Sequence, residues 1–225
     1  MKWVLVTGAA LRLGAAIAKK LADQGHAVVI HYNTHEKQAR ELSAHCLGSE
    51  IIQGDFANSL EDFIGRYKER FPNTKGLINN VGNYALGAPS SLSNIDTLLQ
   101  TNLTAPMSIT HALLPFIKKA KGHIINIGSA NLSNPWTYAT PYGISKAALL
   151  FYTLSLAKEL LGDVRVNMVS PGYLDISEDL PSTVQPVKVL EAAHLIATLF
   201  EQNCITGQNV EVSFSQSIYT HPSSK

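Results

Sequence analysis

Tyr142 and Lys146 are the two side chains of this sequence whose types and spacing best suit acid–base chemistry. They stand four residues apart in a stretch of helical periodicity, residues 142–161, so they share one face of the predicted helix. A free phenol has a pKa near ~10 and is a poor acid at neutral pH unless a cation favours its ionised form. Lys146 can supply that charge, which makes Tyr142 a candidate proton donor to a carbonyl oxygen. On its own, the pair also fits a solvated helix face.

Ser129 and Asn102 are two more polar residues with a candidate task. Ser129 follows the apolar run 123–127, so its hydroxyl is expected at an edge of the sheet, where it can hold a carbonyl oxygen in line with Tyr142. Asn102 lies within a long predicted helix, where asparagine is disfavoured unless its amide has a task. Taken alone, Ser129 would be an ordinary turn serine.

A turn that contains two glycines, Gly8 and Gly14, follows the first predicted strand. Gly8 allows a tight turn and Gly14 lets the next helix pack closely, so that amides at the helix start can face a pyrophosphate. The glycines lie six residues apart and the middle one of the usual dinucleotide pattern is missing. An ordinary strand–turn–helix corner also explains this segment.

The segment 31–36, at the end of the second predicted strand, indicates which dinucleotide would bind. A site for NAD usually carries an acidic residue here, which binds the 2′-hydroxyl of the ribose. The polar neutral residues Asn33 and Thr34 stand in that place, and Glu36 is expected to start the next helix. Hydroxyl, amide and imidazole donors, with Arg12 nearby, suit a 2′-phosphate, so the sequence favours NADP(H). An ordinary strand-to-helix loop is the alternative interpretation of this segment. No metal site is predicted, because His31 and His35 span a strand end.

The remaining expected cofactor contacts also follow strands. Asp55 could accept a hydrogen bond from an adenine amine, although a turn cap is an equally natural role for it. Pro171 and Gly172 end the sixth predicted strand and would line the side of the site that holds the nicotinamide. The full expected set is Gly8, Arg12, Leu13, Gly14, Asn33, Thr34, Asp55, Phe56, Asn80, Val81, Gly82, Tyr142, Lys146, Pro171 and Gly172.

The elements that position these residues alternate along the chain. Short apolar runs predict strands at 2–6, 27–32, 50–53, 76–79, 123–127, 164–169 and 210–214. Amphipathic stretches predict helices at 13–24, 36–45, 60–70, 95–119, 142–161 and 188–201. This alternation predicts an α/β fold, a single doubly wound Rossmann-type domain of about seven parallel strands with helices on both faces. The domain is expected to span residues 1–220, with 221–225 as a tail.

Composition narrows the class of protein. Of 225 residues, 45% are apolar and 16% are charged, which excludes a disordered chain, and the net charge of +1 offers no footprint for nucleic acid. No apolar run approaches the length of about 18 residues that a membrane span needs. The N-terminal residues lack the pattern of a signal peptide. Cys46 and Cys204 have no metal-type spacing, and a reduced, cytoplasmic setting is expected.

Taken together, these residues resemble the short-chain dehydrogenase/reductase family. The resemblance runs over nearly the whole chain, from the first glycine turn to the segment 205–208. The motifs that carry it, in order and at the family's spacing, are Thr7-Gly8…Gly14, Asn79-Asn80-Val81-Gly82, Ser129…Tyr142-x-x-x-Lys146 and Pro171-Gly172.

The resemblance implies that Asn102, Ser129, Tyr142 and Lys146 form a catalytic tetrad. In that scheme Tyr142 protonates the carbonyl oxygen and Ser129 positions it. Lys146 binds the nicotinamide ribose and tunes the tyrosine, and Asn102 holds a proton-relay water. The substrate would be a small-molecule carbonyl compound, and the family often assembles as tetramers or dimers through two long helices.

Two departures from the family pattern leave the substrate open. Arg12 stands where the middle glycine is usual, as in the pteridine reductases, where this arginine helps to hold NADPH. That branch usually carries Asp at the place of Ser129, and serine points instead to ketone reduction, as in the 3-oxoacyl-carrier-protein reductases. A non-catalytic cofactor-sensing protein is a third hypothesis, against which the intact Ser129, Tyr142 and Lys146 set argues.

The second departure is a short segment between Gly172 and Ile205, where the family commonly has a lid of one or two small helices. A lid of only residues 175–181 suggests an open cleft that suits a bulky or carrier-tethered substrate. Its acidic residues, Asp175, Glu178 and Asp179, also fit a solvated loop.

Overall fold

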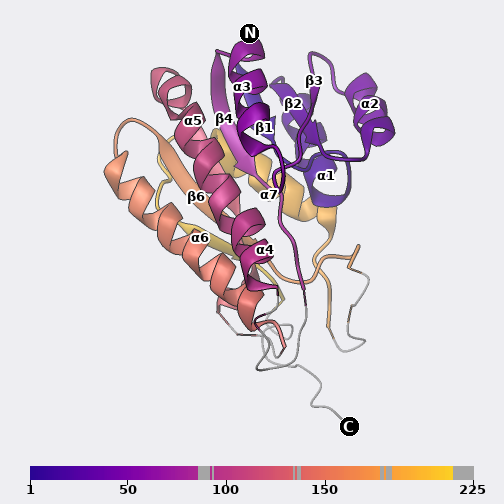
Figure 1. Cartoon of the computed structure of the whole chain (residues 1–225), viewed down its shortest axis with the longest axis vertical. Helices are drawn as coiled ribbons and strands as arrows, with labels where there is room; N and C mark the ends of the chain where they lie inside the picture. The colour runs from indigo at the N-terminus through magenta and orange to yellow at the C-terminus, as the bar shows by residue number, and fades with distance from the viewer. Residues whose placement is uncertain are drawn as a thin grey trace.

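Seven parallel strands form one sheet in the computed structural model of the chain, which describes residues 1–85, 92, 94–133, 135, 138–177, 180 and 184–214 (Figure 1). The strand order is β3-β2-β1-β4-β5-β6-β7, and every neighbouring pair is parallel. The strands are β1 (Trp3–Val6), β2 (Ala27–Tyr32), β3 (Glu50–Gln53), β4 (Thr74–Asn79), β5 (His123–Ile127), β6 (Arg165–Pro171) and β7 (Asn209–Val212).

Helices cover both faces of this sheet, as the sequence predicted. One face is packed by α1, α2 and α7, and the other by α3, α5 and α6. The helices are α1 (Arg12–Asp23), α2 (Glu36–His45), α3 (Leu60–Arg70), α4 (Ile95–Leu99), α5 (Ala105–Lys119), α6 (Thr140–Glu159) and α7 (Val189–Glu201). The prediction of a doubly wound α/β fold is therefore confirmed.

The strands read as continuous apolar runs because both faces of the sheet are buried. Successive strand side chains point to opposite faces. In β1, Val4 and Val6 join the core beneath α1 and α7, whereas Leu5 joins the core beneath α3, α5 and α6. All three side chains are fully buried. Each such side chain contributes about 1.5–3 kcal/mol of transfer free energy, so the two cores hold the strand ends rigidly in place.

The chain reverses its direction of winding between β1 and β4. From this point the sheet runs to β3 on one side and to β7 on the other, so the connections after β1 and β4 diverge and leave a crevice at the carboxyl edge. Thr7 joins the two loops at the crevice, since its Oγ1 accepts hydrogen bonds from the backbone amides of Asn80 at 2.9 Å and Val81 at 3.0 Å.

The structure differs from the sequence prediction in one long helix. Residues 95–119 are helical throughout, as predicted, but a π-helical turn, Gln100–Thr104, lies between α4 and α5. The predicted tail 221–225 lies outside the described residues, and so do Glu178, Asp179 and Pro181 of the expected lid.

Two surface features bear on expectations of environment and assembly. The helix α6 exposes large apolar side chains, since Ile144 is 45% and Phe151 is 75% accessible. The expected self-association through the long helices stays a prediction. Within the described residues, no helix has the length and apolar character needed to cross a membrane.

Candidate active site

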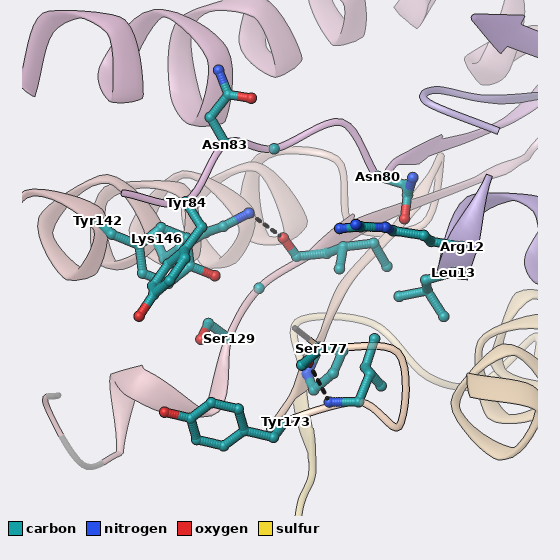
Figure 2. A pocket seen from close by; sticks show the side chains of 16 residues that line it. Arg12, Leu13, Asn80, Asn83, Tyr84, Ser129, Tyr142, Lys146, Tyr173 and Ser177 are labelled. Carbon is teal, nitrogen blue, oxygen red and sulfur yellow. Dashed lines mark hydrogen bonds between the residues drawn. The ribbon is translucent and has the colours of Figure 1, made fainter. Parts of the chain in front are cut away.

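A cleft of about 550 Å³, here called the main cleft, opens at the carboxyl edge of the sheet (Figure 2). It gathers residues from the ends of β4, β5 and β6 and from the starts of α1 and α6. Of the predicted site residues, those that line it are Arg12, Leu13, Asn80, Gly82, Ser129, Tyr142, Lys146, Pro171 and Gly172.

Ser129 and Tyr142 meet inside the main cleft. Ser129 lies two residues beyond β5 and is 2% exposed, and its hydroxyl accepts a hydrogen bond from the backbone amide of Asn131 at 3.2 Å. Both side chains line the cleft, and the Ser129 hydroxyl lies near enough to influence the ionisation of the Tyr142 phenol. Burial raises the pKa of the Tyr142 phenol, and the Ser129 hydroxyl offsets part of that rise. The phenol is therefore held as a neutral O–H group beside a second hydroxyl.

Lys146 brings its ammonium group into the floor of the main cleft. The side chain is 4% exposed, and its Nζ donates a hydrogen bond of 2.9 Å to the carbonyl oxygen of Ile127, at the end of β5. Its Nζ lies 5.9 Å from the centre of the Tyr142 ring. Burial lowers the pKa of Lys146 to about 8. The expectation that Lys146 tunes the acidity of Tyr142 stays a prediction.

Asn102 is fully buried in the π-helical turn 100–104. Its Oδ1 accepts from the backbone amide of Asn83 at 2.7 Å, and its Nδ2 donates to the Asn83 carbonyl at 2.9 Å. The same Nδ2 donates to Ser145 Oγ at 2.9 Å, and Ser145 donates to the carbonyl oxygen of Tyr142 at 2.7 Å. Asn102 thus ties the loop after β4 to the first turns of α6, where Tyr142 stands.

The glycine turn packs against the end of β4. The Asn80 side-chain amide donates to the carbonyl oxygens of Thr7 and Gly8, at 2.8 and 3.2 Å. A Cβ added at Gly14 would lie 2.2 Å from the Gly8 oxygen and 2.6 Å from Asn80 Nδ2, so only glycine fits there. Gly8 itself has a φ of +62°, which glycine adopts without strain.

A second pocket of about 390 Å³, here the turn pocket, adjoins the main cleft at the start of α1. The N-cap residue of α1, Leu11, makes no side-chain capping hydrogen bond to this helix start. Uncapped first-turn amides and the positive end of the helix dipole form a site for an anion such as a pyrophosphate. The predicted residues that line it are Gly8, Arg12, Leu13, Gly14, Asn80, Val81 and Gly82.

A third pocket of about 260 Å³, here the β2 pocket, lies at the ends of β2 and β3 and shares Gly8, Leu11 and Val81 with the turn pocket. Asn33, Asp55 and Phe56 line it, as predicted, whereas Thr34 is not among its lining residues.

The Asp55 carboxylate at this pocket caps its own loop. It accepts hydrogen bonds from the Ala57 amide at 2.9 Å and from Asn58 Nδ2 at 2.8 Å. The bond from Asn58 is the main cause of a lowered pKa for Asp55. The turn-cap interpretation is confirmed, and the expected adenine contact stays a prediction.

Arg12 lies elsewhere than the sequence analysis placed it. Its side chain lines the main cleft and the turn pocket, beside Asn80 in Figure 2, and it does not line the β2 pocket that holds Asn33. The backbone of Arg12 has a φ of +53°, a left-handed conformation that costs a non-glycine residue about 1–2 kcal/mol. Such strain persists where the surroundings hold it in place, and it is common at functional sites.

Several lining residues of the main cleft escaped the sequence analysis. Figure 2 shows Tyr84 beside Tyr142, with ring centres 5.0 Å apart and planes perpendicular, and Tyr173 beyond Ser129. Asn83 also lines the cleft and follows Gly82 directly, so proximity to that motif was the available signal. Ser145, which binds Asn102 without lining the cleft, stands between Tyr142 and Lys146.

Comparison with known proteins decides the family. A family model described as short chain dehydrogenase matches residues 2–184. The chain belongs to the short-chain dehydrogenase/reductase family. It is accordingly an oxidoreductase whose family works with a nicotinamide cofactor.

Relatives of this short-chain dehydrogenase/reductase include the NADP-dependent 3-hydroxy acid dehydrogenase YdfG of Salmonella typhi. The two are 33% identical over 184 residues, which cover 78% of this chain and 73% of YdfG. A double mutant of a short-chain dehydrogenase/reductase from Serratia marcescens has a TM-score of 0.87 at 26% identity, over 96% of this chain and 98% of that one. Landomycin C-6 ketoreductase LanV, solved with bound NADP and rabelomycin, has a TM-score of 0.83 at 28% identity, over 94% of each chain.

A dinucleotide fits the residues of this reductase. The turn pocket shares lining residues with the main cleft on one side and with the β2 pocket on the other, so the three pockets adjoin one another along the sheet edge. The turn pocket, in the middle, lies at the uncapped start of α1, which suits the two phosphates.

The burial of Lys146 predicts a pH-dependent stability. The folded state lowers the pKa of Lys146 from 10.5 to about 8, so the unfolded chain binds this proton more tightly. The cost to folding is full below pH 8 and disappears as the pH rises toward 10.5. Lys146→Met removes this cost. The stability that the substitution adds, measured as its free energy of unfolding minus that of the wild type, should therefore be about 2 kcal/mol larger at pH 7 than at pH 10.

Urea denaturation at the two pH values measures this difference. Lys158→Met, which removes an exposed lysine from the same helix, is the matched control and should show no such dependence. An advantage of Lys146→Met that is equal at pH 7 and pH 10 would contradict the account.

Proposed function

We propose that this enzyme is an NADPH-dependent carbonyl reductase that acts on a ketone, of which 3-oxoacyl compounds are one class. The observation that carries the proposal is the convergence of the side chains of Ser129 and Tyr142 in the main cleft, beside the buried Lys146. Two neighbouring O–H groups in a cleft suit the recognition and protonation of a carbonyl oxygen. The names of YdfG and LanV support a hydroxy or keto substrate for relatives of this chain.

The proposed roles follow from the environment of each side chain. Bound NADPH supplies the hydride for the carbonyl carbon. Tyr142, whose raised pKa keeps it protonated, donates its proton to the carbonyl oxygen, and Ser129 donates a hydrogen bond to that oxygen. Lys146, with a pKa of about 8, carries its charge at neutral pH and stabilises the phenolate that forms on Tyr142.

Asn102 has a different part in this proposal. Both ends of its amide bind the backbone of Asn83, and Nδ2 also donates to Ser145. These contacts support a positioning role, in which Asn102 fixes the helix turn that carries Tyr142. The relay water that the family resemblance implies stays a prediction.

The β2 pocket supports NADPH over NADH. Asn33 occupies the place of the usual NAD-binding acid, and the carboxylate of Asp55 is engaged in its own loop. Arg12 adds positive charge on the other side of the glycine turn, beside the turn pocket, where it suits the pyrophosphate half of the cofactor.

Cofactor choice gives a direct prediction. NADPH should bind at least about tenfold more tightly than NADH, because a 2′-phosphate gains charge-assisted hydrogen bonds in a pocket where no free acid repels it. Asn33→Asp should reverse this preference, since a carboxylate repels the phosphate and accepts from a 2′-hydroxyl. Titration of tryptophan fluorescence with each cofactor measures both constants. Equal dissociation constants in the wild type would refute the assignment.

Pterin reduction is the second candidate, and the position of Arg12 in the main cleft favours it. Ser129 disfavours it, because a carboxylate at that place can accept hydrogen bonds from a pterin amine, whereas beside a ketone it opposes the developing negative charge.

Ser129→Asp separates the two candidates. We expect the wild type to oxidise NADPH with β-keto thioesters, diketones or quinones, and Ser129→Asp to lose at least about a hundredfold of that rate. Ser129→Ala controls for loss of the hydroxyl without the added charge and should retain more ketone activity than Ser129→Asp. If the wild type reduces dihydropterin faster than every ketone tried, the pterin assignment replaces the ketone assignment.

A further inference from the structure

His31 is a buried histidine at the carboxyl end of β2, and both of its ring nitrogens are engaged. The side chain is 2% exposed. Its Nδ1 accepts a hydrogen bond of 2.9 Å from the backbone amide of Gly8, in the glycine turn. Its Nε2 donates a hydrogen bond of 3.0 Å to the carbonyl oxygen of Gly54, which follows β3. One imidazole therefore spans the loops that follow two other strands.

The backbone of His31 strengthens this connection. Its carbonyl oxygen accepts from the amide of Ala9 at 2.8 Å, so two successive amides of the glycine turn are held by one residue. The next residue, Tyr32, accepts from the amide of Gly54 at 2.9 Å. The turn is thus fixed to β2 by a pair of hydrogen bonds, and the amides left for a phosphate are those at the start of α1.

The ring of His31 also forms part of an aromatic wall. It stacks on Phe56, with centres 4.2 Å apart and planes within 10°, and meets the ring of Phe63 at 5.1 Å, edge to face. Only the neutral imidazole with its proton on Nε2 can accept from Gly8 and donate to Gly54 at once. Burial favours that neutral form, since it lowers the pKa of His31 to about 4.

These partners are not scattered through the core. Gly8, His31, Gly54 and Phe56 all line the β2 pocket, the site proposed above for the adenosine half of NADPH. A histidine with purely structural partners would lie away from this wall. Here the contacts of the ring with Gly8, Gly54 and Phe56 all end on residues that line the same pocket, and only the contact with Phe63 does not.

We propose that His31 is a positioning residue for the cofactor, which holds the glycine turn and the Phe56 wall in their binding geometry before NADP(H) arrives. This role rests on the proposed cofactor binding and makes His31 a determinant of the affinity for the cofactor. A loop that is already ordered loses less conformational freedom on binding, so the affinity is higher. Without the ring, the Gly8 amide and the Gly54 carbonyl lose their common partner, and the bound cofactor must order both loops.

Three substitutions at residue 31 separate the contributions of the ring stacking and of the two hydrogen bonds of the imidazole. His31→Phe keeps a stacking ring and removes both hydrogen bonds. His31→Asn places an amide oxygen near the position of Nδ1, so it can still accept from Gly8, and His31→Gln places an amide nitrogen near Nε2, so it can still donate to Gly54. His45→Phe is the matched control, because His45 is exposed on α2 and lines none of the three pockets.

The measurement is the dissociation constant of NADPH, from the fluorescence of the bound nicotinamide, together with the thermal midpoint of each free variant. We expect His31→Phe to bind NADPH at least about tenfold more weakly and His31→Asn to recover most of that loss. His31→Gln should fall between the two, and His45→Phe should match the wild type within about twofold. If His31→Phe does not fold, the order of the Asn and Gln variants decides, since both keep one hydrogen bond.

Dissociation constants within about twofold of wild type in all three variants, with lowered thermal midpoints, would show a purely structural histidine and overturn the inference. Equal losses of NADPH affinity in His31→Asn and His31→Gln would overturn the claim that the hydrogen bond from Gly8 contributes more than the hydrogen bond to Gly54. The test needs no substrate, so a failure of carbonyl reduction leaves it intact. If the wild type prefers NADH, the NADPH assignment fails, and the same variants titrated with NADH still test His31.

Discussion

Parallel pairing of β1 with both β2 and β4 is the constraint on which the site depends. Parallel strands bring their carboxyl ends to one edge, and the reversal of winding at β1 leaves that edge open. The loops after β1, β4, β5 and β6 therefore meet although they are far apart in the chain. Thr7 joins the loops after β1 and β4. Asn102 joins the π-helical turn to Ser145 of α6. The row of pockets is a consequence of strand order, and its chemistry comes from the few polar residues at the strand ends.

The electrostatics of the main cleft follow from its burial. A buried phenol resists ionisation and a buried ammonium tends to lose its proton, so burial raises the pKa of Tyr142 and lowers the pKa of Lys146 to about 8. At neutral pH the phenol therefore keeps its proton and Lys146 keeps its charge, which are the states that a proton donor and its supporting cation need. The protein carries the cost of this arrangement in stability and offsets it through the two apolar cores that hold β5 and α6.

Local pattern predicted much of this structure. Apolar runs located the strands because both sheet faces are buried, and the spacing of Tyr142 and Lys146 located the reactive helix face. Features that depend on contacts between distant segments escaped prediction. The π-helical turn around Asn102 is accompanied by bonds to Asn83 and Ser145, and the clamp at His31 needs Gly8 and Gly54, so neither is visible in a local window. Arg12 was expected near the donors at the end of β2, whereas its side chain lines the main cleft and the turn pocket.

The central claim is that Tyr142 donates the proton in a hydride-transfer reaction. The most direct measurement is the rate of NADPH oxidation by Tyr142→Phe, with a ketone that the wild type reduces and at saturating NADPH. Tyr152→Phe, on the same helix and outside the cleft, is the control. The account predicts a loss of at least about a hundredfold in turnover for Tyr142→Phe, with NADPH affinity within about twofold of wild type. Retention of more than about a third of the wild-type rate would contradict it.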